Sequence, residues 1–156
     1  MRKFLTLTAL CFIAVSAHAA GNKVIEEGLV IYTITDDVSI NDSLTGYAGD
    51  PANGRKVAID RKKGNCLACH VMPISDQPYH GETGPSLFGV ANRYSEGELR
   101  MLVVNSKVVN PDTMMPAFYR VSGFTRTGKK FVGKSIISAE EVEDVVAYLL
   151  TLNKDE

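Results

Sequence analysis

The sequence predicts a small all-α domain, and two observations lead to that prediction. Apolar residues recur at helical spacing in the later segments of the chain, and three segments begin with a side chain that favours a helix N-terminus. The stretches between these segments are long and rich in glycine and proline. Loops of that length are unusual in a compact domain unless they are functional, so we expect them to pack around a bound group.

The first 19 residues have the pattern of a cleaved secretory signal peptide. Arg2 and Lys3 precede an apolar run over 4–15, and Ala17-His18-Ala19 has the small residues of a cleavage site. A membrane anchor is the alternative, but the run is shorter than the about 20 apolar residues that span a bilayer. We therefore expect export, with cleavage after Ala19 leaving 137 of the 156 residues.

Composition and charge exclude some functions for the processed chain. Its 15 basic and 18 acidic residues give a formal charge of −3, which disfavours nucleic-acid binding because that function needs a strongly basic face. No second apolar run is long enough to cross a membrane. The length fits one domain over 50–156, preceded by an N-terminal extension over 20–49.

The extension is polar, loosely patterned and irregular. Its residues 30–35 could form a short strand or an extended arm. We expect the extension to wrap the domain or to meet a partner.

The first helix of the domain is expected to begin after Asp50, a good N-cap residue, with Pro51 at its first position. It should run to about Lys63 and end at Gly64-Asn65. Two later helices are predicted over 95–105 and 138–152. Each begins with a capping box, in which a serine and a glutamate three residues later satisfy each other's backbone amides: Ser95 with Glu98, and Ser138 with Glu141.

Cysteine usage identifies the bound group. Cys11 leaves with the signal peptide, so Cys66 and Cys69 are the two cysteines of the processed chain. They lie in Cys66-Leu67-Ala68-Cys69-His70, and C-x-x-C-H is the attachment pattern of haem c. Two thiols at this spacing form thioether bonds to the two vinyl groups, and the following histidine ligates the iron. The sequence therefore predicts one covalent haem c, with His70 as the proximal iron ligand.

The motif has two other interpretations. A structural zinc site needs four ligands, and Cys66, Cys69, His70 and His80 would supply them, although three are crowded at one end. A thioredoxin-like redox pair would need a βαβ pattern, which this chain lacks. Haem is favoured over both.

The other side of the iron needs a ligand if the group is to carry electrons without binding substrate. Met115 is the predicted distal ligand, because it lies in a loop far from the proximal histidine and a proline fixes the chain after it. Met114 and His80 remain as alternatives. Met101 has the spacing of a core residue, and Met72 is too close to the motif to reach the opposite face.

Neighbouring groups should tune such a site. The backbone carbonyl of Pro85 is expected to accept the free ring N–H of His70. Arg93 and Tyr94 are candidates to approach the haem propionates, although they are equally consistent with an ordinary loop.

Three stretches, 66–70, 84–87 and 115–118, occur in the order of the class I cytochrome c motifs, and the chain resembles that family. The resemblance includes Gly54, a small residue where the family's first helix crosses its last near Tyr148. It implies a small all-α fold wrapped around one haem. A closer resemblance, over about residues 50–152, is to the SoxX family of monohaem cytochromes. It rests on five stretches: 64–70, 84–87 with 93–94, 98–100, 110–116 and 143–149.

The SoxX resemblance implies a periplasmic heterodimer with a SoxA-like cytochrome. Such a pair acts as an L-cysteine S-thiosulfotransferase, which oxidatively joins thiosulfate to a cysteine of a SoxYZ-like carrier protein. That reaction releases two electrons, whereas one haem holds one. After haem attachment the processed chain has no free thiol, and with Met115 bound it has no open iron position. We therefore expect a non-catalytic electron-transfer subunit that passes electrons to a downstream acceptor cytochrome.

Three other functions stay open on the sequence alone. The main alternative is a free-standing periplasmic electron shuttle with one haem. A haem enzyme or gas sensor would need an open iron position, and a zinc-binding interaction module would contain no haem.

Overall fold

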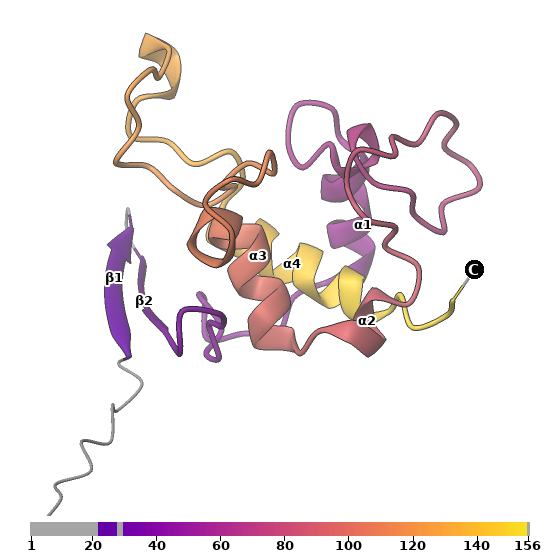
Figure 1. Ribbon diagram of the computed structural model, residues 1–156, viewed down its shortest axis with the longest axis horizontal. Coiled ribbons are helices and arrows are strands. Elements are labelled where there is room, and N and C mark those ends of the chain that lie inside the picture. Colours follow the sequence, from indigo (N-terminus) through magenta and orange to yellow (C-terminus); the bar gives the residue numbers. More distant parts are fainter. Residues whose placement is uncertain (1–21, 28–29, 156) are drawn as a thin grey trace, which may run out of the picture.

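The computed structural model of the protein describes residues 22–27 and 30–155, so the predicted signal peptide over 1–19 lies outside the described residues. A two-stranded antiparallel sheet is followed by helices joined by long loops (Figure 1). This arrangement is the all-α fold that the sequence predicts, with the sheet added in the extension. The elements are β1 (Lys23–Glu27), β2 (Val30–Ile34), α1 (Pro51–Ile59), η1 (Cys66–Ala68), α2 (Val90–Arg93), α3 (Glu96–Val109), η2 (Lys129–Phe131) and α4 (Ala139–Leu150).

Helices α1 and α4 cross at a point of very close backbone approach. A Cβ atom added to Gly54 of α1 would lie 1.8 Å from the carbonyl oxygen of Asp144 and 2.9 Å from Cβ of Tyr148. Any side chain at residue 54 would therefore force the two helices apart. The crossing predicted from Gly54 and Tyr148 is confirmed, and it fixes the position of the chain that enters the cysteine motif.

Helix α1 begins where the sequence predicts and ends earlier. The Asp50 carboxylate accepts the Ala52 N–H at 2.8 Å, and Pro51 occupies the first turn. The helix ends at Ile59 instead of about Lys63, because Asp60 takes an extended conformation (ψ 115°) and residues 61–64 form a turn. The Lys63 ammonium then pairs with Glu141 at the start of α4.

Helix α3 is longer than predicted and is broken near its end. It begins with the predicted capping box and extends to Val109 instead of Asn105. Asn105 itself has an extended backbone (φ −157°, ψ 80°), so the helix is kinked there. Such a break leaves carbonyls of the preceding turn without their usual helical partners. Helix α4 has its predicted capping box and ends at Leu150, two residues before the predicted end.

The capping box of α3 predicts a pH-dependent contribution to stability. The backbone N–H and the hydroxyl of Ser95 donate to the Glu98 carboxylate and lower its pKa below 4.5. A lowered folded-state pKa means that the stabilisation is fully present above about pH 4.5 and is lost as the pH falls through the folded value. We expect Glu98→Gln to lose stability relative to the wild type at pH 6, and this difference to shrink towards pH 3.

Urea denaturation followed by circular dichroism at both pH values measures this effect. Glu82→Gln is the matched control, because Glu82 is an exposed acid in a loop. A difference between wild type and Glu98→Gln that stayed the same at both pH values would contradict the prediction.

The N-terminal extension is part of the folded domain. Its strand β2 confirms the strand alternative for residues 30–35, whereas the partner strand β1 was not predicted. Ile40 and Leu44 of the following segment are buried in the core. The extension therefore wraps the helices, which is the first of the two roles expected for it.

A buried ion pair holds the extension against the helices. Arg100 of α3 and Glu143 of α4 are 1% and 4% exposed, and the guanidinium Nε lies 2.9 Å from the carboxylate. Arg100 also donates to the carbonyl of Ile40 at 2.8 Å, and Glu143 accepts the Leu44 N–H at 2.9 Å. Burial alone would lower the pKa of Arg100, but the hydrogen bonds and charges of Glu143 and Glu96 raise it overall. Both buried charges are thus paired, as low-dielectric surroundings require.

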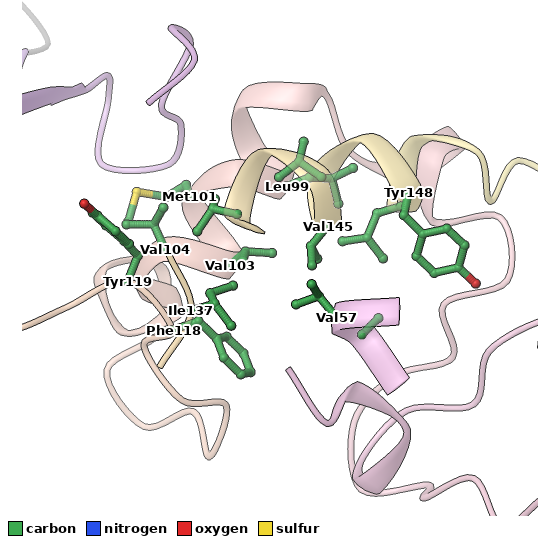
Figure 2. Packing of buried hydrophobic residues seen from close by; sticks show 14 of the residues in the cluster. Val57, Leu99, Met101, Val103, Val104, Phe118, Tyr119, Ile137, Val145 and Tyr148 are labelled. Atoms are coloured by element: carbon green, nitrogen blue, oxygen red, sulfur yellow. The ribbon is translucent and has the colours of Figure 1, made fainter. Parts of the chain in front are cut away.

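The apolar core lies between α1, α3, α4 and the segments on either side of residues 120–136. Figure 2 shows Val57 of α1 and Val145 of α4 close to each other, and Phe118 and Ile137 beneath Val103 of α3. Cys66 and Met115 are partly buried and both pack against this same cluster. Two of the residues predicted to hold the haem, far apart in sequence, therefore border one core. In the described part of the chain, no helix is both long and apolar enough to span a membrane.

Candidate haem-binding site

The two cysteines of the motif lie on one tight turn. Residues Cys66–Ala68 form the 3₁₀ turn η1, in which the N–H groups of Cys69 and His70 both donate to the carbonyl of Cys66, at 3.1 and 2.9 Å. Neither thiol is in a disulfide. Cys66 is partly buried, and burial raises the pKa of its thiol to about 11, whereas Cys69 is exposed. Both thiols are thus free to bond to one group placed beside the turn.

The His70 ring is oriented by the backbone of a later loop. Its Nδ1 lies 2.7 Å from the carbonyl oxygen of Pro85. A carbonyl oxygen can only accept a hydrogen bond, so Nδ1 carries the proton and Nε2 keeps its lone pair. The acceptor predicted from the sequence is therefore confirmed, and the geometry leaves Nε2 as the nitrogen that can ligate a metal.

Gly84 allows that loop to lie against the histidine ring. Its N–H donates to the carbonyl of Cys69 at 2.7 Å, which holds the loop on the motif. A Cβ atom at residue 84 would lie only 2.4 Å from Cε1 of His70 and 2.7 Å from Nδ1. In the sequence Gly84 is only part of a motif, because its contact with the histidine depends on the fold.

We expect Gly84→Ala to displace the His70 ring and break its hydrogen bond to Pro85, because the added methyl group overlaps the ring. The variant should incorporate less haem or show an altered visible spectrum in both redox states. Ser86→Ala, two residues further along the same loop, is the control and should have a spectrum like that of the wild type. A Gly84→Ala protein with wild-type haem content, spectrum and reduction potential would refute this role.

The loop that contains Met115 is held by the kink in α3. The carbonyls of Val103 and Val104 accept the N–H groups of Phe118 and Tyr119, both at 3.2 Å. Directly after the kink, the Ser106 hydroxyl donates to the carbonyl of Met115 at 3.1 Å. The carbonyls that a regular helix would use internally thus anchor the loop. This anchoring was not predicted, since nothing in the local pattern around residue 105 indicates a break in the helix.

The other methionines lie in places that suit other roles. Met72 and Met101 are buried in the core, at 2% and 0% exposure, which confirms the interpretation of Met101 as a core residue. Met114 is 82% exposed, whereas Met115 is partly buried against the core. Of the two adjacent methionines, Met115 therefore has the placement that a ligand facing the interior needs.

His80, the remaining alternative ligand, uses both ring nitrogens on backbone groups. Its Nδ1 accepts the Met72 N–H at 3.2 Å, and Nε2 donates to the carbonyl of Gln77 at 2.9 Å. The ring lines a shallow hollow of about 480 Å³ together with Met72 and Phe88. Cys66, Cys69, His70 and Met115 do not line this hollow. These contacts give His80 a structural role in its own loop.

Arg93 is the last residue of α2, and Tyr94 directly follows it. Arg93 donates to the carbonyls of Ser86 and Phe88, both at 2.6 Å, so it braces the loop that follows Pro85. Tyr94 is 40% exposed. The expectation that they approach haem propionates stays a prediction.

The residues present fit a covalent haem. They offer two free thiols on one turn, an imidazole whose unprotonated nitrogen is fixed by a carbonyl, and a partly buried thioether on the same core. Two attachment thiols, an adjacent imidazole and a distant thioether are the donor set of haem c, whereas a structural zinc site needs four ligands in one place. Among the described residues, no group of three or more His, Cys, Asp or Glu side chains is gathered as a metal site would gather them.

Comparisons with known proteins show what the chain is similar to. A family model described as cytochrome c matches residues 51–153. A chain in the crystal structure of SoxXA from P. pantotrophus is similar, with 38% sequence identity and a TM-score of 0.71, over 80% of this chain and 95% of that chain. The c-type cytochrome SorU from Sinorhizobium meliloti matches at 24% identity with a TM-score of 0.44, over 67% and 92%. No curated protein sequence matches the chain.

Proposed function

The chain belongs to the cytochrome c family as a SoxX-like electron-transfer cytochrome with covalent haem c, and from that premise we propose that it works as one subunit of a SoxAX-type heterodimer. The observation that carries the proposal is the match to the SoxXA chain, which extends over 95% of that chain's length. We further propose that it acts in the periplasm, after removal of the signal peptide predicted over 1–19.

The proposed role of each site residue follows from its chemistry. Cys66 and Cys69 would attach the porphyrin through thioethers, and Nε2 of His70 would bind the iron from one side. The Pro85 carbonyl would keep the imidazole in the required tautomer and raise its basicity as a ligand. Met115 would close the other side, so that no small molecule reaches the metal.

Haem c, when bound, supplies a one-electron couple between ferric and ferrous iron, and His/Met ligation raises its potential. The complex as a whole would join thiosulfate to a cysteine of a SoxYZ-like carrier, releasing two electrons and one proton. This chain would serve that L-cysteine S-thiosulfotransferase as a relay towards an acceptor cytochrome. With both thiols used in attachment and Met115 on the iron, the sulfur chemistry would take place on the SoxA-like partner.

The test is to purify the chain from the periplasm under native conditions and to identify what accompanies it. We expect a haem c spectrum and a second, SoxA-like haem protein in equal amounts, with thiosulfate-dependent activity towards a carrier cysteine. A monomeric haem protein would favour the free-standing electron shuttle instead. A colourless protein with the mass of the processed chain alone would refute any cytochrome function.

A further inference from the structure

Residues 120–136 form an arm that projects from the helices (Figure 1, orange). Its two ends are fixed on buried residues. Phe118, Tyr119 and Ile137 are each 7% exposed or less. The carbonyl of Phe118 accepts the N–H groups of both Ile136 and Ile137, at 2.9 and 3.3 Å, which closes the base of the arm. The arm is therefore a loop with an anchored base.

The side chains along the arm are unusually apolar for a projecting loop. Phe124, Phe131, Val132 and Ile136 are 48%, 57%, 64% and 46% exposed. Single exposed apolar residues are common, but four of them on one short projecting segment form the kind of patch that marks a contact site. Aromatic side chains in particular are enriched in the centres of protein interfaces.

The arm is also strongly basic. Between Asp112 and Glu140 the sequence has five basic residues and no acidic one, although the processed chain as a whole is acidic. The basic residues are Arg120, Arg126, Lys129, Lys130 and Lys134. A local field of one sign steers molecules of opposite charge towards it and disfavours partners of like charge. The charge therefore selects an occupant with an acidic surface.

Part of the arm is ordered in advance of any contact. The Arg120 guanidinium donates to the carbonyls of Ser122 and Gly123, at 2.8 and 3.1 Å, and lies 5.0 Å from the centre of the Phe124 ring. The N–H of Phe131 donates to the carbonyl of Gly128 at 2.8 Å, in the short turn η2. Such local bonds reduce the conformational entropy that binding would have to remove.

We propose that the arm is the surface through which this chain holds a stable protein partner, whose complementary face is an apolar hollow with an acidic rim. Exposed aromatic and aliphatic side chains at this density favour a lasting complex over a brief electron-transfer encounter, because lasting interfaces are the more hydrophobic ones. The inference rests on the proposed function, in which that partner is the SoxA-like cytochrome.

The test uses the haem-loaded chain and the purified SoxA-like subunit, with affinity and association rate measured at low and high salt. Phe131→Ser/Val132→Ser should weaken the affinity by about 30-fold or more, the effect of losing one strongly contributing interface residue. Val24→Ser/Ile31→Ser is the matched control, since these β1 and β2 side chains are similarly exposed, at 67% and 68%. The control should bind like the wild type.

Charge-reversal variants test whether the basic side chains of the arm accelerate association, separately from the apolar contact. Arg126→Glu/Lys129→Glu should slow association and reduce its dependence on salt, whereas Arg61→Glu/Lys62→Glu, on the exposed turn after α1, should leave both nearly unchanged.

Four results would overturn the inference. If the arm variants bind the partner as the wild type does, the proposed function survives and the arm is not the interface. If the wild type does not bind the SoxA-like subunit at all, the proposed function fails as well. If Phe131→Ser/Val132→Ser changes the visible spectrum or potential of the isolated chain, the arm packs on the haem instead. If the wild type binds vesicles of anionic phospholipid and the arm variants do not, the occupant is a membrane.

Discussion

Replacing Met115 by alanine should let the reduced protein bind carbon monoxide and should lower its reduction potential. Met115 is the partly buried member of the pair at 114–115, and hydrogen bonds to its own carbonyl and amide hold its backbone in place. Alanine has no sulfur to bind iron, so the distal position would open. Loss of a thioether ligand should lower the potential by ~0.1 V or more, within the ~0.8 V range that axial ligands set.

Visible spectroscopy with added carbon monoxide and a redox titration measure these two effects. Met114→Ala is the matched control, because Met114 is 82% exposed and adjacent in sequence. It should keep the spectrum, the potential and the inertness to carbon monoxide of the wild type. An unchanged spectrum in Met115→Ala would mean that another residue is the ligand. A change in Met114→Ala alone would assign the ligand role to Met114.

Removing one member of the buried ion pair should destabilise the fold by about 3–5 kcal/mol, since that is the usual cost of leaving a buried charge without its partner. In Glu143→Ala the guanidinium of Arg100 stays buried and loses its buried partner, keeping only the exposed Glu96, and the N–H of Leu44 loses its acceptor. A loss of this size is a large share of the about 5–15 kcal/mol that stabilises a typical domain. Urea denaturation of the haem-loaded protein measures it.

Two further variants distinguish the destabilising effect of the buried charge from a general loss of packing. Arg100→Met/Glu143→Leu removes both charges and should recover much of the loss, because apolar residues of similar volume often replace a buried pair without penalty. Asp76→Asn, which breaks the exposed pair with Arg55, should change stability little. If Glu143→Ala is as stable as Asp76→Asn, the buried pair does not hold the extension in place.

The sequence predicts best those features whose cause is local. Both capping boxes and the Asp50 N-cap depend on side chains within three residues of the amides they bind, so the pattern alone identifies them. The cysteine motif is equally readable, because attachment chemistry requires its residues to be contiguous. The Pro85 carbonyl was also expected as the acceptor for His70, and the structure confirms it.

Features that depend on distant segments could not be predicted. Helix α1 ends at Ile59, where a turn brings the N–H of Gly64 to the carbonyl of Val57, and Lys63 of that turn pairs with the distant Glu141. The role of Arg100 arises from two helices and the extension meeting at one point. The contact of Gly84 with the histidine ring likewise needs the fold. In each case the sequence contains the residue but does not indicate which distant residue it contacts.

The break at Asn105 affects how this chain can diverge over evolution. The loop that contains Met115 is bound to α3 through main-chain groups, since the amides of Phe118 and Tyr119 donate to the carbonyls of Val103 and Val104. Every amino acid except proline carries such an amide. Homologous chains can therefore exchange the side chains at residues 118 and 119 for others of similar size while the methionine keeps its place, and only a proline there would release it.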